Sequence, residues 1–191
     1  MTTNDSLQRP VTRVALVTAA LLMVPLVAMR VGHEVVWTPF DFAVAGTLLF
    51  GTGLAIELLV RRSRNLAYRL GAALGVGSAL FLVWANLAVG VIGSERNPAN
   101  LMYLGVLAIG IALSAGARFE ARGMARALFA MAGAQAAVAV IALAFGLGGT
   151  ESGPLEIVWT NGMFVALFGA SALLFRSAAR KQAGAGTSPR R

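Results

Sequence analysis

The sequence contains no cysteine, one histidine (His33) and one lysine (Lys181) among its 191 residues. The lack of cysteine excludes disulfide bonds, thiolate metal sites and cysteine nucleophiles. A single histidine cannot build a metal site of two imidazoles within one chain, and a lysine in the C-terminal tail cannot form a Schiff base inside a helical bundle. Known catalytic motifs such as GxSxG, HExxH and the P-loop are also missing. We therefore expect no cofactor and assign no catalytic residue.

Charge is also scarce in this chain. Asp, Glu, Lys and Arg make up 13% of the residues, against a usual share of about 25% in soluble domains. Hydrophobic residues make up 58%, and the mean hydropathy is +0.75. A soluble domain needs a charged surface that so few ionisable residues cannot cover, so most of the apolar side chains must face lipid.

The charge that is present is mostly positive, with a formal net charge of +8 at pH 7. In a soluble protein this balance favours nucleic acid as a partner. Here the basic residues form short clusters between long apolar runs, a pattern typical of membrane proteins whose arginines set orientation. The expected partner is therefore the lipid bilayer and not nucleic acid.

The apolar runs have the length of membrane-spanning helices. Hydrocarbon offers no hydrogen-bond partner to the backbone, so a chain crosses it as helices of about 20 residues or as a closed barrel. The predicted fold class is an all-α polytopic membrane protein with six transmembrane helices arranged as three tandem helical hairpins. The predicted spans are 12–31, 39–60, 68–92, 98–117, 123–147 and 154–176.

The predicted domain organisation follows from these spans. A cytoplasmic segment, 1–11, precedes a transmembrane domain, 12–181, with hairpins at 12–60, 68–117 and 123–176, and a disordered basic tail covers 182–191. A signal peptide is the alternative for the first span, because arginines precede an apolar run of suitable length. The absence of a small-x-small cleavage site favours the membrane span.

Charge divides the connections into two groups. One side of the predicted membrane has 14 bases and three acids, and the other side has two bases and five acids. Since basic connections stay in the cytoplasm, we expect both termini to be cytoplasmic and the acidic connections to lie outside.

The acidic connections share a pattern of Gly-x-Glu followed by a proline with Asp, Asn or Glu two residues later. Its three occurrences are Gly32-His33-Glu34 with Pro39 and Asp41, Gly93-Ser94-Glu95 with Pro98 and Asn100, and Gly149-Thr150-Glu151 with Pro154 and Glu156. Such self-similarity predicts a threefold repeat of one hairpin, about 60 residues long. A quasi-threefold arrangement would bring the three acidic connections together.

Helix punctuation is the alternative explanation of the repeated pattern. Proline is favoured in the first turn of a helix, glycine stops the preceding helix, and Thr38 with Asp41 resembles a capping box. Helix punctuation does not explain the glutamate after each glycine, because an anion just past a helix C-terminus meets the negative end of the helix dipole.

These acids form the first candidate site. Carboxylate oxygens of Glu34, Glu95 and Glu151, with Asp41 and Glu156 nearby, suit a divalent or an organic cation, and the pattern does not identify a metal. His33 beside Glu34 is a candidate pH-sensitive element. The alternatives are that acidic connections are only the counterpart of basic ones, and that His33 is a solvated loop residue.

Polar residues inside the spans form the second candidate site. Asn86, Gln135 and Asn161 are expected to face the bundle interior, where they line a path or hydrogen-bond across helices. Glu57 is expected to pair with Arg61 on one helix face. Glycines are expected to bring helices close together: Gly71 and Gly75 with small-xxx-small spacing, and Gly46, Gly51, Gly53, Gly105 and Gly110 as flat surface.

Two longer stretches resemble known sequences. They are Phe40-Asp41-Phe42 with Leu48 to Leu54, and Val83 to Gly90 continuing through Gly93-Ser94-Glu95 to Asn97 to Tyr103. The chain resembles a family of small six-span bacterial membrane proteins with no assigned activity. The resemblance implies a bacterial cytoplasmic membrane.

Three functions are compatible with these features. The first is a small permease or ion-conducting protein with an outward-facing acidic cation site. The second is a non-catalytic accessory or assembly subunit whose glycine-rich faces dock a second copy or another membrane protein. The third, less favoured, is a membrane enzyme acting through His33 and Glu34.

Overall fold

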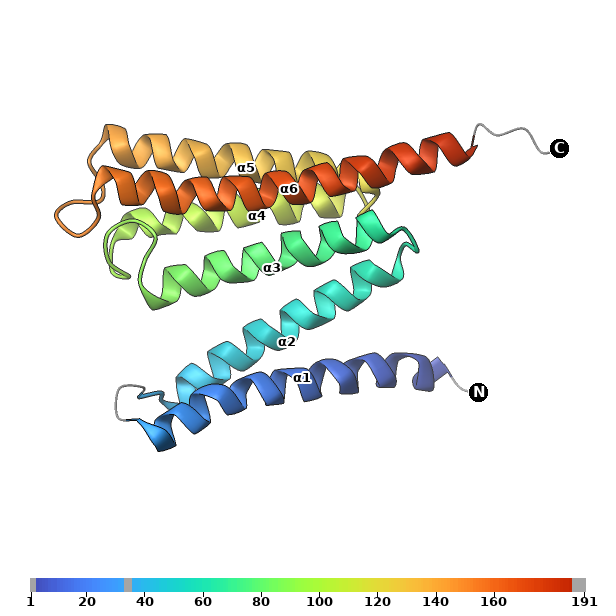
Figure 1. Ribbon diagram of the computed structural model, residues 1–191, viewed down its shortest axis with the longest axis horizontal. Coiled ribbons are helices and arrows are strands. Elements are labelled where there is room, and N and C mark those ends of the chain that lie inside the picture. The colour runs from blue at the N-terminus through green and yellow to red at the C-terminus, as the bar shows by residue number, and fades with distance from the viewer. Residues whose placement is uncertain (1–2, 33–35, 187–191) are drawn as a thin grey trace. The chain divides into compact units, whose positions relative to one another are not determined.

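The computed structural model describes residues 3–32 and 36–186 of the chain. Within these ranges the fold is all-helical and without strands (Figure 1). The elements, in chain order, are α1 (Thr3–Val31), α2 (Pro39–Arg61), α3 (Leu66–Ala88), the 3-10 helix η1 (Pro98–Leu101), α4 (Met102–Gly116), α5 (Ala121–Ala144) and α6 (Pro154–Gly186). With η1 counted together with α4, the described chain has six helices long and apolar enough to cross a membrane, which confirms the predicted fold class.

Two helices end earlier than the sequence predicts. α3 stops at Ala88 and α5 at Ala144, whereas the apolar pattern continues to residues 92 and 147. Gly90 and Gly146, two residues after these ends, have φ of +77° and +59°. A positive φ is accessible to glycine without steric cost and does not continue a right-handed helix. The expectation that Gly93 and Gly149 stop these helices is therefore wrong, although both also have positive φ.

The last helix is longer than predicted. α6 continues to Gly186, so residues 182–186, which the sequence assigns to the tail, are helical. At a rise of about 1.5 Å per residue, its 33 residues extend for about 50 Å, more than the roughly 30 Å of a hydrocarbon core. Part of α6 therefore projects beyond the membrane.

The chain forms two compact units, residues 1–61 and 62–191. In the first unit α1 packs on α2. Gly46 of α2 faces Leu22 of α1, and Gly53 faces Val14, so two of the predicted glycines do bring these helices together. At the end of α2, Glu57 Oε1 lies 3.0 Å from Arg61 Nε, which confirms the predicted ion pair.

In the second unit α6 packs against both α3 and α5, and α5 packs against α4. The fully buried side chains of this unit include Tyr103, Phe164, Phe168 and Phe175. Three of these four belong to α6, which packs against helices on two sides. The core of the unit is therefore built around α6.

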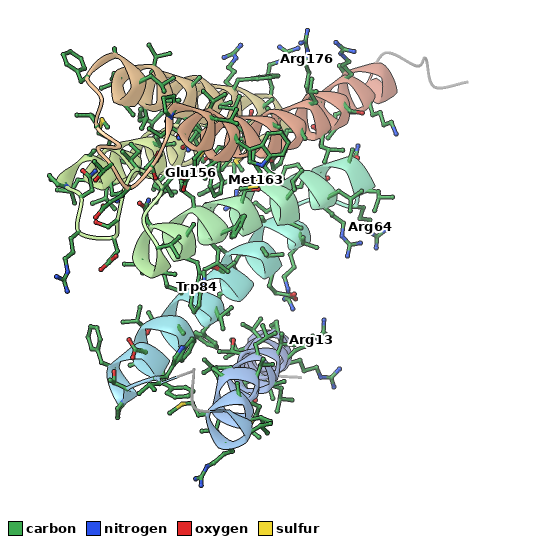
Figure 2. The ribbon with its side chains drawn as sticks, turned by 60° about the vertical axis from the view of Figure 1, so that its left-hand side comes forward. Arg13, Arg64, Trp84, Glu156, Met163 and Arg176 are labelled. Atoms are coloured by element: carbon green, nitrogen blue, oxygen red, sulfur yellow. The ribbon has the colours of Figure 1, made fainter. Side chains whose placement is uncertain are left out.

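Charge separates the two ends of the second unit. At the end where α3 and α5 begin and α6 finishes, which we call the basic end, lie Arg62, Arg64, Arg69, Arg118, Arg122, Arg126, Arg176, Arg180 and Lys181. At the opposite end, which we call the acidic end, lie Glu95, Glu151 and Glu156. Figure 2 shows Arg64 and Arg176 toward one end of this unit and Glu156 toward the other.

Glycines of α3 allow α6 to approach closely. The hydroxyl of Ser171 donates a hydrogen bond to the backbone carbonyl of Gly71 at 2.8 Å. A Cβ atom on Gly75 would lie 2.7 Å from Ser171 Oγ and 3.2 Å from Leu128 Cδ1. The predicted small-xxx-small contact is thus confirmed for Gly71 and Gly75, whereas Gly105 has open space where a Cβ would be.

Replacing Gly75 by alanine tests this contact. We expect Gly75→Ala to lower the free energy of unfolding by about 1 kcal/mol or more, because the added methyl overpacks the interface between α3, α5 and α6. The matched control is Gly77→Ala in the same helix, where a Cβ meets no atom within 4 Å. The control should be neutral or stabilising, since alanine favours helix over glycine. Equal melting temperatures for both variants in detergent would contradict the close contact.

Candidate functional site

Two connections meet at the acidic end of the second unit: residues 89–97 after α3 and residues 145–153 after α5. The side-chain amide of Asn97 donates to the backbone carbonyl of Leu147 at 2.7 Å. The backbone N–H of Gly93 donates to the buried hydroxyl of Ser152 at 3.2 Å. These hydrogen bonds hold the two connections side by side.

Asn100 organises the first of these connections. Its side-chain oxygen accepts from the backbone N–H groups of Val91 (3.1 Å) and Ile92 (2.9 Å). Its side-chain nitrogen donates to the carbonyls of Ile92 (3.3 Å) and Ser94 (2.8 Å). Val91 and Ile92 are both buried, so this side chain satisfies backbone groups that have no helical partner.

Asp41, which occupies the same position of the repeated pattern as Asn100, also serves the backbone. Its carboxylate accepts from the backbone N–H of Thr38 at 2.7 Å and from the Thr38 hydroxyl at 2.8 Å, and its own N–H donates to that hydroxyl at 3.3 Å. This is the predicted capping box. Pro39, Pro98 and Pro154 each begin a helix. Helix punctuation therefore accounts for the prolines and for Asp41.

The glutamates of the repeated pattern have no such role in the described residues. Glu95 is exposed, with its carboxylate 3.6 Å from Arg96 Nε. Glu151 is exposed as well, and its Oε2 lies 3.4 Å from the position of a Cβ on Gly93, so it lies against the connection that contains Glu95. Two of the three predicted acids thus belong to connections in contact.

The remaining predicted residues fall into three cases. His33 and Glu34 lie outside the described residues, Asp41 belongs to the first unit, and Glu156 is exposed in the first turn of α6. Among residues 3–32 and 36–186, no group of three or more His, Cys, Asp or Glu has the geometry to hold a metal ion. The convergence of all three acidic connections stays a prediction.

A polar network crosses the interior of the second unit. Tyr103 of α4 donates from its hydroxyl to Asn161 Oδ1 of α6 at 2.9 Å, and Gln135 Nε2 of α5 donates to the same oxygen at 3.0 Å. Asn161 Nδ2 donates to the carbonyl of Ile157 at 2.9 Å. All three side chains are fully buried. Sequence reasoning identified Gln135 and Asn161 but missed Tyr103, although a tyrosine within a span needs a partner for its hydroxyl.

Two buried amide oxygens of the second unit accept no hydrogen bond within the described part of the chain. They are Gln135 Oε1 on α5 and Asn86 Oδ1 on α3. A buried acceptor without a donor costs about 1–3 kcal/mol, and in a membrane interior this cost is not relieved by bulk water. Gln135 lies about 14 Å along the helix axis from the end of α5 at Ala144, and Asn86 lies about 3 Å from the end of α3 at Ala88. The unsatisfied acceptors therefore belong to the acidic half of the unit.

Removing the Asn100 side chain tests how the acidic end is built. We expect Asn100→Ala to lower the free energy of unfolding by about 2 kcal/mol or more, because two buried N–H groups lose their acceptor. Asn100→Asp, which keeps the acceptor oxygens, should lose less. Hydrogen exchange at the Val91 and Ile92 amides should accelerate in Asn100→Ala but not in the exposed control Glu95→Ala. Unchanged exchange in Asn100→Ala would contradict this role.

Comparisons with protein-family models, with curated proteins and with solved structures found no significant match for this chain. The resemblance to small bacterial membrane proteins accordingly stays a prediction. The structure supports a multi-pass helical membrane protein, whose apolar helices contact lipid. A more specific function has to be argued from the arrangement of its own residues.

Proposed function

We propose that this membrane protein is a small permease for a cation, with an acidic surface that collects the cation and amide oxygens inside the second unit that receive it. The orientation proposed from the charge distribution places the acidic end outside, and both termini and the basic end in the cytoplasm. The proposed location is the bacterial cytoplasmic membrane.

The observation that carries this proposal is the pair of buried amide oxygens without donors, Asn86 Oδ1 and Gln135 Oε1. Polar groups in a membrane interior are costly, and they commonly mark the route of a substrate or ion. Both unsatisfied groups are acceptors, which attract a cation or a hydrogen-bond donor and not an anion. The partial negative charge of these oxygens attracts the same ligands as the exposed carboxylates of Glu95 and Glu151 at the same end of the unit.

The chemistry required of these groups is binding and partial desolvation. Carboxylates at the entrance raise the local concentration of a cation, and amide or carbonyl oxygens replace part of its hydration shell. A divalent metal ion and an organic ammonium ion both suit oxygen ligands of this kind.

An accessory subunit is the second candidate function, and one observation favours it. The bonds from Tyr103 and Gln135 to Asn161 join α4, α5 and α6 through fully buried atoms. Such a network stabilises helix packing without requiring any substrate. Under this alternative the unit is a static bundle whose glycine-containing faces associate with another membrane protein.

Cation-dependent stability separates the two functions. The full chain in detergent is heated with the chloride of magnesium, potassium or tetramethylammonium, and the melting temperature is recorded. We expect one cation class to stabilise the protein, by about 2.7 kcal/mol at a hundred times its dissociation constant. The double variant Glu95→Gln and Glu151→Gln should lose most of this gain, whereas Glu57→Gln, which removes a carboxylate at the end of α2, should keep it.

Flux through the membrane completes the test. In proteoliposomes we expect uptake of the stabilising cation by the unmodified chain and its loss in Gln135→Leu, with helical content retained by circular dichroism. If no cation stabilises the protein, or if the two-glutamate variant responds like the unmodified chain, the permease proposal fails. If Gln135→Leu takes up the cation as fast as the unmodified chain does, the interior oxygens are not part of the transport pathway.

A further inference from the structure

A cavity of about 590 Å³ opens at the basic end of the second unit. Its wall is formed by the start of α3, the connection between α4 and α5, the first turn of α5 and the last turns of α6. The polar and charged residues of its lining include Arg62, Tyr68, Arg118, Glu120, Arg122 and Gln182. This cavity lies at the opposite end from the proposed cation site and is independent of it.

The loop between α4 and α5 has an unusual backbone at this cavity. Arg118 and Phe119 have φ of 51° and 59°, the left-handed region that residues with side chains rarely adopt. Each such residue costs about 1–2 kcal/mol. Backbone conformations of this kind persist where surrounding contacts determine them, and they are frequent at functional sites.

Side chains from α3 and from the connection before it hold the carbonyl groups of both residues. Arg62 donates to the carbonyl of Arg118 at 2.9 Å, and the Tyr68 hydroxyl donates to the carbonyl of Phe119 at 2.7 Å. The Arg62 guanidinium also lies over the Phe119 ring, 5.0 Å from its centroid. The loop is therefore fixed by side chains more than 50 positions earlier in the sequence, and the position of Arg118 at the cavity is fixed with it.

The charge in the cavity wall is not balanced. Its lining contains three arginines, Arg62, Arg118 and Arg122, and one acidic residue, Glu120. In the part of the chain that the structure describes, ion pairs join Glu57 to Arg61 and Glu95 to Arg96, and no carboxylate pairs with Arg62, Arg118 or Arg122. Three guanidinium groups held around one cavity favour an anion.

The first turn of α5 also favours an anion in this cavity. Glu120 is the N-cap residue of this 24-residue helix, but its side chain does not accept a hydrogen bond from the first turn. Ala121 and Arg122, which follow, line the cavity. The positive end of the helix dipole and the free N–H groups of a first turn both favour an anion.

The position of the cavity along α6 corresponds to the level of lipid headgroups in the proposed membrane orientation. Gln182 belongs to the part of α6 that follows Arg176, Arg180 and Lys181, beyond the apolar length needed to cross hydrocarbon. Basic pockets between helices on the cytoplasmic side are suited to anionic lipid headgroups. A soluble phosphate compound reaches the same place from the cytoplasm.

We propose that this cavity binds a phosphate group, carried by an anionic lipid headgroup or by a soluble phosphate compound. Arg118 and Arg122 contact the phosphate oxygens, since a planar guanidinium matches phosphate with two parallel hydrogen bonds. Arg62 contributes positive charge and positions the loop of Arg118 and Phe119. Glu120 repels the anion and keeps its affinity moderate.

Matched charge variants of the full chain test the proposal in detergent. The probes are phosphatidylglycerol, phosphatidylcholine and inorganic phosphate, and the dissociation constant of each is measured at low and high salt. We expect phosphatidylglycerol or inorganic phosphate to bind saturably and phosphatidylcholine to bind weakly. The double variant Arg62→Gln and Arg122→Gln should bind the anionic probe at least about tenfold more weakly.

The control is the double variant Arg64→Gln and Arg126→Gln, which removes one arginine from each of the same two segments outside the cavity. It should bind within about twofold of the unmodified chain. Arg122→Gln alone, which leaves the Arg62 contacts intact, covers the case in which the first double variant fails to fold. Binding of phosphatidylglycerol without competition by inorganic phosphate identifies a lipid, and competition identifies a soluble phosphate. Equal losses in Arg122→Gln and in the control, or no saturable binding of either anionic probe, would overturn the proposal.

Discussion

A hydrocarbon interior provides no hydrogen-bond partner, and most features of this fold follow from that constraint. Backbone groups pair within helices, and the six long apolar helices satisfy the requirement with few charged residues. Three polar side chains inside the second unit, Tyr103, Gln135 and Asn161, bond to one another across three helices. Among the described residues, Asn86 Oδ1 and Gln135 Oε1 are the two buried side-chain atoms that carry the cost of a missing hydrogen bond.

The same constraint concentrates chemistry at the helix ends, where the backbone needs partners that the helix itself does not supply. At the acidic end Asn100 bonds the backbone of one connection, and Asn97 and Ser152 join this connection to the next one. At the basic end, Arg62 and Tyr68 bond the carbonyls of a loop in left-handed conformation. Both ends are held by side-chain hydrogen bonds, and the proposed ligands of the two ends have opposite charge.

The sequence predicts the number of helices and many of their starts, because apolar length and first-turn prolines are local properties. It also predicts the Glu57–Arg61 pair and the close contact at Gly71 and Gly75. It does not predict where α3 and α5 stop, since the apolar pattern continues past Gly90 and Gly146 and only their φ values show the end.

The basic cavity lay beyond sequence reasoning for a different reason. Arg62 and Arg118 are 56 positions apart, and their contact depends on how α3, α4, α5 and α6 pack. A left-handed conformation at Arg118 and Phe119 has no local signal, because neither residue favours it. From the sequence alone, these arginines indicate only which connections lie in the cytoplasm. Tertiary packing gives three of them a common cavity.

The proposed topology places the acidic and basic ends of the second unit on opposite sides of the membrane. The lack of cysteine allows a direct measurement with two single-cysteine variants, Thr150→Cys in the connection before α6 and Ala183→Cys near the end of α6. Intact cells are treated with a membrane-impermeant maleimide before and after permeabilisation. The account predicts labelling of Thr150→Cys in intact cells and of Ala183→Cys only after permeabilisation. Labelling of both variants from the same side would contradict it.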